Sequence, residues 1–463
     1  MLRKFYYDPE YYKNLFRLAA PILVQYVISN LLNIIDIAMI GKLGEAAIAA
    51  VGVCNQLFFV MVLFFFGINS GAGIFAAQYF GKGDHDAIRR VTVLGLGLSL
   101  LIGLVFTLIS QLFPSQLVGI YTADPEVIRI GARYLRIVGL GYIPTSITMA
   151  FVTSLRATRQ VRLPMIVSTI ALALKTALSY ALIFGLFGMP ELGTDGAAIG
   201  TVVARLVECG VLVGFIYGTK NIIAFKRIKL DSYTPEFMSR FLRTILPVAI
   251  NEMVWSLAVM ANNIVYGHIG TAAFAAINVV TSIESLVFVL FMAFGEATGI
   301  MIGNKIGEKD KNGAFTYGVR SLSIGFTGAL MIGVIIFSLA TRIASFYHLE
   351  AETINYLVRL IQVFSLILWL RVSNFFIIIG ILRAGGDTKM CLILDTLPIW
   401  LIGVPTAVIT GLILKLPIYE VYLLVHIEEL IKLFFGLRRV LTKKWIHDLV
   451  HHEEPLPPEA AVI

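Results

Sequence analysis

An internal repeat constrains this sequence more than any other feature. Identical residues recur 226 positions apart without a gap, beginning with Pro21 and Pro247. The further pairs at this offset are Gly41 and Gly267, Gly44 and Gly270, Ala46-Ala47 and Ala272-Ala273, Ala49-Ala50 and Ala275-Ala276, Gly73 and Gly299, Gly81 and Gly307, and Asp84 and Asp310. At an offset of 227, Leu155-Arg156-Ala157 aligns with Leu382-Arg383-Ala384 and Pro190 with Pro417. Many membrane transporters build a central site from such duplicated halves.

The composition is that of a membrane protein. Of the 463 residues, 58% are hydrophobic and 14% are charged, whereas soluble proteins average about 25% charged residues. A helix needs about 20 residues to cross a hydrocarbon core of about 30 Å. Twelve stretches meet this length: 15–40, 46–75, 91–113, 129–153, 163–187, 196–218, 241–266, 274–302, 318–340, 355–382, 390–413 and 417–437. The sequence therefore predicts an all-α integral membrane protein with twelve transmembrane helices in two six-helix parallel repeats.

The distribution of Lys and Arg predicts the orientation. Basic residues gather at both ends of the chain and in the loops that follow each even-numbered span, whereas the alternate loops carry few of them. Examples are Arg3, Lys4, Lys82, Arg156, Arg159, Lys226, Arg227, Lys229, Lys305, Arg383 and Arg438. Because retained cytoplasmic loops carry the positive charge, we expect a multi-pass protein of the cell inner (plasma) membrane with both termini cytoplasmic. The net charge of +8 is then a sign of topology and not of a nucleic-acid site.

One polar stretch divides the chain. We expect an N-lobe at 1–217, a cytoplasmic linker at 218–240, a C-lobe at 241–440 and a cytoplasmic tail at 441–463. The tail contains His447, His451 and His452 and ends in an acidic, proline-rich run. We interpret it as solvated. Three scattered cysteines indicate neither a disulfide framework nor a metal site.

Several motifs in order resemble a known family. They are Asn33 to Gly44 with Ala46 to Ala50, Gln78 to Asp84, Gly196 to Thr201, Asn251-Glu252 with Trp255, Leu382 to Lys389, and Trp400 to Pro405. Together with the duplication, this set resembles the multidrug and toxic compound extrusion (MATE) transporters over nearly the whole chain. The resemblance implies a V-shaped, two-lobed bundle that exports amphipathic or cationic organic compounds by antiport with H⁺ or Na⁺. It implies no cofactor, contact with membrane lipid, and a monomer.

The resemblance places one coupling site in the N-lobe. The family uses a carboxylate at the position of Asp36, and an intramembrane ionisable group needs a partner or a function. Thr201 matches a threonine of the family's cation site, but Lys175 and Ser179 stand where relatives carry Asn and Asp. A lysine there makes a Na⁺ site near Asp36 doubtful. It favours an ion pair between Asp36 and Lys175 that protonation would break.

A second set of candidates lies in the C-lobe. Glu252, near the middle of its span, is a candidate coupling residue and a possible neighbour of Na⁺. Asn251, Trp255, Glu284 and Asp395 are candidate substrate contacts, together with Tyr26, the repeat mate of Glu252. Aromatic side chains bind flat organic cations well. Asp395 could equally fix the packing of its helix.

Other charged residues have structural explanations. Arg205 with Glu208, and Glu428 with Lys432, have the spacing of ion pairs along one helix face. Glu296 is expected to be an interfacial partner. Arg371 needs an acidic neighbour that the sequence does not name.

Three alternatives stay open at this point. A lipid-linked sugar or lipid flippase of the same wider superfamily would carry several bases in a central cavity, whereas this chain has more intramembrane carboxylates than bases. An enzyme is disfavoured because the sequence contains no nucleophile elbow, zinc motif or phosphate-binding loop. A channel is disfavoured because the acidic groups of the two halves are placed asymmetrically.

Overall fold

The computed structural model describes residues 8–225, 233–347 and 349–451, and within these ranges every regular element is a helix. The basic residues Arg3, Lys4, Lys226, Arg227 and Lys229, with His452 and the acidic end of the tail, lie outside the described residues. The first half contains α2 (Pro9–Gly41), α3 (Glu45–Lys82), α4 (His85–Leu112), α5 (Pro114–Gly119), α6 (Pro125–Gly139), α7 (Tyr142–Ala157), α8 (Arg162–Phe184) and α9 (Thr194–Gly218).

The second half repeats this order with more interruptions. It contains α10 (Pro235–Ile269), α11 (Thr271–Gly307), α12 (Lys311–Ser345), α13 (Ala351–Phe375), η2 (Phe376–Arg383), α14 (Thr388–Pro398), η3 (Ile399–Gly403), α15 (Val404–Val408), η4 (Ile409–Ile413), α16 (Ile418–Val425) and α17 (Glu428–Leu441). The three η elements are π-helical. Such turns often occur where a membrane helix changes direction or carries a functional group.

The repeat extends to the helix starts. Asp8 and Thr234, which are 226 positions apart, each accept a hydrogen bond from a backbone N–H three residues later, and each is followed by a proline at the first helical position. A capping side chain satisfies an otherwise orphaned N–H, and proline fits the first turn because it has no N–H to lose. The same chemistry therefore begins both repeats at the same place.

The spans agree with the prediction except at the end of the chain. Ten helices, or continuous helical stretches, are long and apolar enough to cross a membrane, and α6 with α7 forms an eleventh span that bends by 49°. The predicted twelfth span, 417–437, is instead the pair α16 and α17, interrupted at His426-Ile427. The charges of Glu428, Glu429 and Lys432 lower its apolar character, so this region is not one continuous apolar helix.

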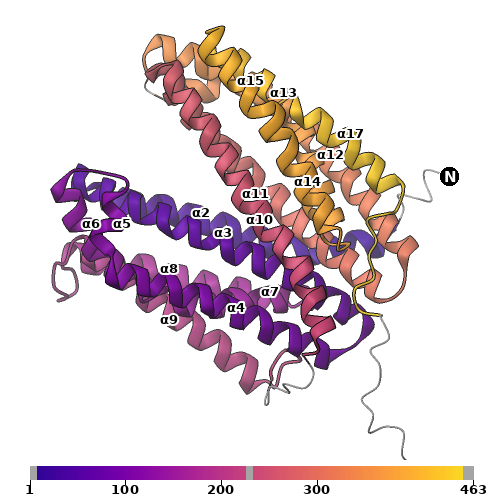
Figure 1. The fold of residues 1–463 in the computed structure, drawn as a ribbon. Coiled ribbons are helices and arrows are strands. Elements are labelled where there is room, and N and C mark those ends of the chain that lie inside the picture. Colours follow the sequence, from indigo (N-terminus) through magenta and orange to yellow (C-terminus); the bar gives the residue numbers. More distant parts are fainter. Residues whose placement is uncertain (1–7, 226–232, 348, 452–463) are drawn as a thin grey trace, which may run out of the picture.

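The helices form two lobes. The ribbons of α2 to α9 and of α10 to α17 lie close together near the end of the chain and diverge toward the opposite end (Figure 1). The closest approach joins equivalent positions of the two repeats. A Cβ atom on Gly81 would lie 1.9 Å from the carbonyl oxygen of Asn304, and one on Gly307 would lie 1.9 Å from that of Gln78. Only glycine permits this backbone contact, which explains this pair in the repeat.

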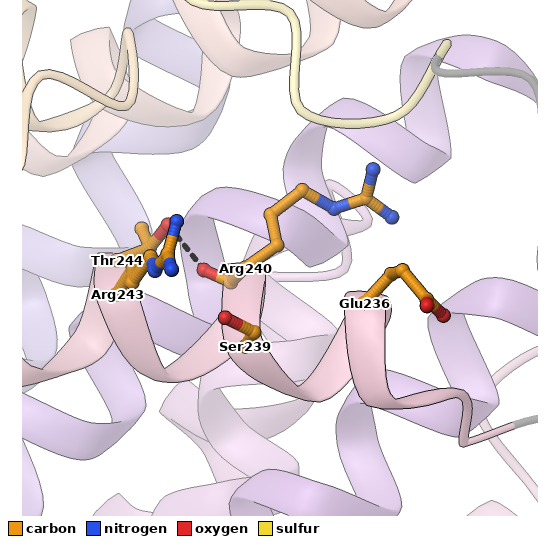
Figure 2. A pocket seen from close by; sticks show the side chains of 5 residues that line it. All are labelled: Glu236, Ser239, Arg240, Arg243 and Thr244. Atoms are coloured by element: carbon orange, nitrogen blue, oxygen red, sulfur yellow. Dashed lines mark hydrogen bonds between the residues drawn. The ribbon is translucent and has the colours of Figure 1, made fainter.

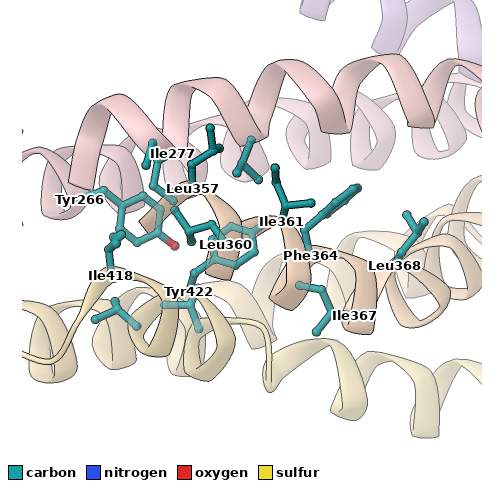
Figure 3. Packing of buried hydrophobic residues seen from close by; sticks show 14 of the residues in the cluster. Tyr266, Ile277, Leu357, Leu360, Ile361, Phe364, Ile367, Leu368, Ile418 and Tyr422 are labelled. Carbon is teal, nitrogen blue, oxygen red and sulfur yellow. The ribbon is translucent and has the colours of Figure 1, made fainter. Parts of the chain in front are cut away.

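Each lobe has its own apolar core. In the C-lobe, Leu357, Leu360 and Phe364 of α13 are fully buried and pack among α10, α11 and α16 (Figure 3). Tyr266 and Tyr422 lie in the same cluster, so their hydroxyl groups are held inside the lobe. Within a membrane, close van der Waals packing stabilises such contacts, because lipid is as apolar as the side chains themselves. These cores support the lobes as separate units.

Residues 442–451, here called the C-terminal segment, do not form a solvated tail as expected. Trp445 is fully buried against Gly385 of the C-lobe, and the His447 N–H donates to the Gly385 carbonyl at 2.8 Å. The segment then reaches the N-lobe, where Gln78 donates to the His447 carbonyl at 3.1 Å and accepts from the Leu449 N–H at 3.0 Å. The segment therefore connects the lobes where they are closest.

Candidate functional site

The N-lobe candidate is a buried ion pair. Lys175 Nζ on α8 lies 2.5 Å from Asp36 Oδ2 on α2, and the two side chains are 20% and 13% exposed. The predicted pair is therefore present. Protonation of Asp36 would remove the attraction and leave the ammonium group without a counter-charge.

Further polar groups surround this pair. Thr176 Oγ1 on α8 lies 3.5 Å from Asp36 Oδ1. Thr201 on α9 donates to the Ala197 carbonyl of its own helix at 2.9 Å. The sequence did not identify Thr176, because it does not stand in a recognisable motif.

Tyr26 belongs to an inter-lobe ion network. Its hydroxyl donates to Glu296 Oε2 on α11 at 2.9 Å, and Arg156 Nη1 on α7 lies 2.7 Å from Glu296 Oε1. The Arg156 guanidinium also stands 5.6 Å from the Tyr26 ring centroid. Glu296 is thus an interfacial partner, as expected, and joins the lobes. Tyr26, a candidate substrate contact, has its hydroxyl engaged in this conformation.

Glu252 forms the equivalent network in the C-lobe. Its Oε1 lies 2.8 Å from Arg383 Nη2, and Arg383 Nη1 lies 3.5 Å from Ser70 Oγ on α3 of the N-lobe. Glu252 is the repeat mate of Tyr26, Arg383 of Arg156, and Ser70 of Glu296. The repeat therefore relates the two networks, but their carboxylates, Glu296 and Glu252, stand at positions that are not equivalent.

Asn251, the residue before Glu252, contacts Asp395. Asn251 Nδ2 donates to Asp395 Oδ2 at 3.0 Å, and Lys432 Nζ on α17 lies 3.5 Å from Asp395 Oδ1. The neighbouring Trp400 indole donates to the Val254 carbonyl at 3.0 Å. Asp395 thus joins α10, α14 and α17. Trp255 lies one turn along α10 from Asn251 and is half-buried.

Glu284 occupies a separate position in the C-lobe. It forms an ion pair with Arg371 on α13, which identifies the acidic neighbour that Arg371 needs. Tyr422 on α16 donates to Glu284 Oε2 at 3.3 Å. The predicted site residues are therefore not gathered in one site. The structure divides them among the N-lobe pair, two inter-lobe networks and two C-lobe groups.

Neither carboxylate proposed as a neighbour of Na⁺ lies in a ready-made metal site. Among the residues with described positions, no group of three or more His, Cys, Asp or Glu side chains is arranged to hold a metal ion. Asp36 and Glu252 are each paired with a base. A Na⁺ ion at either position would have to displace that base.

A small pocket is lined by none of these groups. It is lined by Glu236, Ser239, Arg240, Arg243 and Thr244 on the first turns of α10 (Figure 2). The Thr244 hydroxyl donates to the Arg240 carbonyl at 3.0 Å, as is common within a helix. None of the predicted site residues lines this pocket, so we do not assign the substrate to it.

Comparison with known proteins identifies the family of the chain. The MatE family profile matches residues 21–181 and 247–409. The two matches begin at Pro21 and Pro247, the prolines that define the repeat. "Probable multidrug resistance protein YoeA" of Bacillus subtilis is 27% identical over 89% of this chain and 90% of its own length. "Probable multidrug resistance protein NorM" of Thermotoga maritima is 26% identical over 86% of this chain and 85% of its own.

Solved structures share the fold. The "outward-facing conformation of a multidrug resistance MATE family transporter of the MOP superfamily" has a TM-score of 0.84 at 20% identity, covering 96% of this chain and 98% of that one. A MOP superfamily transporter from Pyrococcus furiosus, whose binding pocket is described as having reverse polarity, has a TM-score of 0.83 at 21% identity and the same coverage. The chain belongs to the MatE family of multidrug and toxic compound extrusion transporters.

Proposed function

We propose that this protein is a secondary active exporter of amphipathic or cationic organic compounds. An inward-moving H⁺ or Na⁺ drives the export, and the two lobes expose the substrate alternately to either side of the membrane. The names of the relatives support drug-like substrates. The protein works without a cofactor, as a monomer, in the inner membrane.

The ion pair between Lys175 and Asp36 carries this proposal. The pair lies inside a lobe at 2.5 Å, where a charged residue costs at least about 2.5–3.5 kcal/mol unless it is paired. A proton on Asp36 releases Lys175 and changes the preferred distance between α2 and α8. The side chains thus convert ion binding into a change of helix geometry. We favour H⁺ over Na⁺ here because the lysine already provides the positive charge.

The positions of the basic loops suggest which side is open. Arg156, Arg159 and Lys82 all lie where the lobes touch: Arg159 Nε donates to Asn304 Oδ1 at 2.5 Å, and Lys82 Nζ to the Val450 carbonyl at 2.8 Å. Basic loops stay in the cytoplasm. The lobes would then be closed toward the cytoplasm and divergent toward the outside, as an exporter requires after it has carried its substrate across.

The flippase alternative lacks support from the charges. Its anionic substrate would require free bases, but Arg371, Arg383 and Lys432 of the C-lobe each contact at least one carboxylate. The same groups suit a cation better than an anion.

Proteoliposomes test the proposal. Wild-type protein should move a fluorescent organic cation against its gradient when a pH or a Na⁺ gradient is imposed, and Asp36→Asn should not. Glu208→Gln is the matched control, because it removes a buried carboxylate of the same lobe that pairs locally with Arg205 at 2.8 Å. Transport that ignores both gradients, or equal loss in the two variants, would contradict the role of Asp36.

A further inference from the structure

A second group of charges lies inside the C-lobe, apart from the Asp36 pair. It is formed around α17 by side chains of four helices, and we call it the α17 cluster: Asn251, Asn374, Asp395, Glu428, Glu429 and Lys432. Lys432 and Glu428 are each 3% exposed. Local pairing of Glu428 with Lys432 was expected from their spacing, but Asn251, Asn374 and Asp395 come from distant parts of the chain.

Lys432 is the only base inside the cluster. Its Nζ lies 3.1 Å from Glu428 Oε2, 3.5 Å from Asp395 Oδ1 and 3.7 Å from Glu429 Oε1. One ammonium group therefore faces three carboxylates. If all three were ionised, the cluster would hold two uncompensated negative charges in the interior of a lobe.

Two bases on the surrounding helices lie near the cluster, but each is already paired with a carboxylate outside it. The elements that pack on α17 include α13, α14, η2 and η3. Arg371 is paired with Glu284 and also attracts Glu429, and Arg383 is paired with Glu252 and also attracts Asp395. His426, in the break before α17, hydrogen bonds to the Tyr422 carbonyl through Nδ1. The N-terminus of α17 favours a negative charge near Glu428, but this effect is smaller than the cost of an unpaired buried carboxylate.

Two buried acceptors in the cluster have no hydrogen-bond donor among the described residues. They are Asn251 Oδ1 and Asn374 Oδ1, on side chains that are 1% and 3% exposed. The amide nitrogens of both asparagines donate to cluster carboxylates, at 3.0 Å and 2.6 Å. Buried polar atoms normally find a partner. Asp395 and Glu429 thus accept amide N–H groups, as ionised carboxylates do, whereas Glu428 has only Lys432 as a partner. Excess negative charge and unused acceptors in the same place indicate a proton bound there.

We propose that the α17 cluster is a proton-binding site of its own, with the proton on Glu428. A protonated Glu428 removes one excess charge and adds a donor, while Lys432 keeps its contacts with Asp395 and Glu429. A proton fits better than Na⁺, because the ammonium group already fills the position between the carboxylates and no metal-binding group of acids is present in the described chain. This inference goes beyond the proposed function, since it holds whatever the protein transports.

Infrared difference spectroscopy on the purified full chain in lipid nanodiscs tests the proposal without transport. The C=O stretch of a protonated carboxyl group should be visible at neutral pH in wild type and shift in D₂O. We expect it to be lost in Glu428→Gln and retained in Glu208→Gln, which removes an equally buried carboxylate from the N-lobe. Lys432→Gln should enlarge the signal, because the remaining carboxylates lose their only base.

The outcomes are separable. A carboxyl signal that is the same in Glu428→Gln and wild type would overturn the proposal. So would a signal that disappears when NaCl is added at constant pH, which would indicate a Na⁺ site. If Glu428→Gln does not fold, the Lys432→Gln spectrum decides: an unchanged signal overturns the proposal. A signal that behaves as expected in a protein that moves no organic cation would leave this site standing and contradict only the proposed function.

Discussion

Arg156 and Arg383 occupy equivalent positions in the two repeats, yet Arg156 forms its ion pair across the lobe contact and Arg383 forms its ion pair within its own lobe. Arg156 binds Glu296 of the opposite lobe at 2.7 Å, whereas Arg383 binds Glu252 of its own lobe at 2.8 Å. The equivalent of Glu296 is Ser70, and the equivalent of Glu252 is Tyr26. An ion pair therefore joins the lobes at Arg156. At the equivalent position, the weaker contact of Arg383 with Ser70 joins them.

Glu296→Gln should loosen the closed end of the molecule. It breaks an inter-lobe ion pair, at a cost below the ~3–5 kcal/mol of a fully buried pair, because Glu296 is 32% exposed. A cysteine introduced at the lobe contact should therefore react faster with a thiol reagent. Glu252→Gln is the matched control, since it breaks the equivalent pair within one lobe. Equal labelling rates in both variants would show that it does not matter whether the broken ion pair joins the two lobes or lies within one of them.

Moving the carboxylate gives a stricter test. Tyr26→Glu combined with Glu296→Ser places the acid beside Arg156 within the N-lobe, as Glu252 stands beside Arg383. Arg156 keeps a counter-charge, so we expect stability near that of wild type, while the labelling rate rises as in Glu296→Gln. If the double variant labels as slowly as wild type, the inter-lobe ion pair does not hold this end closed.

Gly81→Ala should prevent the lobes from meeting. Its Cβ would lie 1.9 Å from the Asn304 carbonyl oxygen, and overpacking of this kind costs typically about 1–3 kcal/mol. Gly52→Ala on the same helix is the control, because its Cβ meets nothing within 4 Å. Thermal unfolding in detergent should show a lower midpoint for Gly81→Ala only. A similar loss in both would point to helix α3 itself and not to the lobe contact.

The C-terminal segment should be stabilising. Trp445 is fully buried, and replacing such a side chain by alanine costs about 3–5 kcal/mol. We expect Trp445→Ala to release the segment from Gln78 and to make residues 445–450 sensitive to protease. Full protease resistance in this variant would show that the segment does not depend on the tryptophan.

Acid should release the same segment at a predictable pH. Burial raises the pKa of Asp387, but the nearby His447 side chain and the hydrogen bond from Arg439 outweigh it and lower that pKa below its ordinary value of 3.8. A depressed pKa contributes stability that is present above the ordinary value and lost as the pH falls through the folded pKa. Proteolysis of residues 445–450 should therefore stay constant from neutral pH down to about 4 and increase only below it. Asp387→Asn should show the increase at neutral pH.

Local and repeated features could be predicted from the sequence. The offset of 226 located both halves, and hydropathy located the membrane helices. Ion pairs with helical spacing, such as Arg205 with Glu208, follow from geometry within one helix. The pair of Asp36 and Lys175 was predicted because both residues fall on motif positions of the family. The repeat also carries the two glycines at which the lobes touch.

Long-range partners could not be predicted in this way. Nothing in the local sequence links Arg371 to Glu284, or Arg156 to Glu296, because these contacts depend on how whole helices cross. The break before Glu428 was missed because a hydropathy window averages over it. The C-terminal segment was misread for a similar reason: its polar histidines and acidic end conceal Trp445 and Leu449, which become buried only against the lobes.

Counter-ion movement tests the central claim most directly. Proteoliposomes loaded with a fluorescent organic cation, with no imposed ion gradient, would be followed with an internal pH dye and an internal Na⁺ indicator while the cation leaves. Antiport predicts that the inside becomes more acidic, or gains Na⁺, in step with efflux in wild type and not in Asp36→Asn. Efflux of the cation with no movement of either ion would contradict the account.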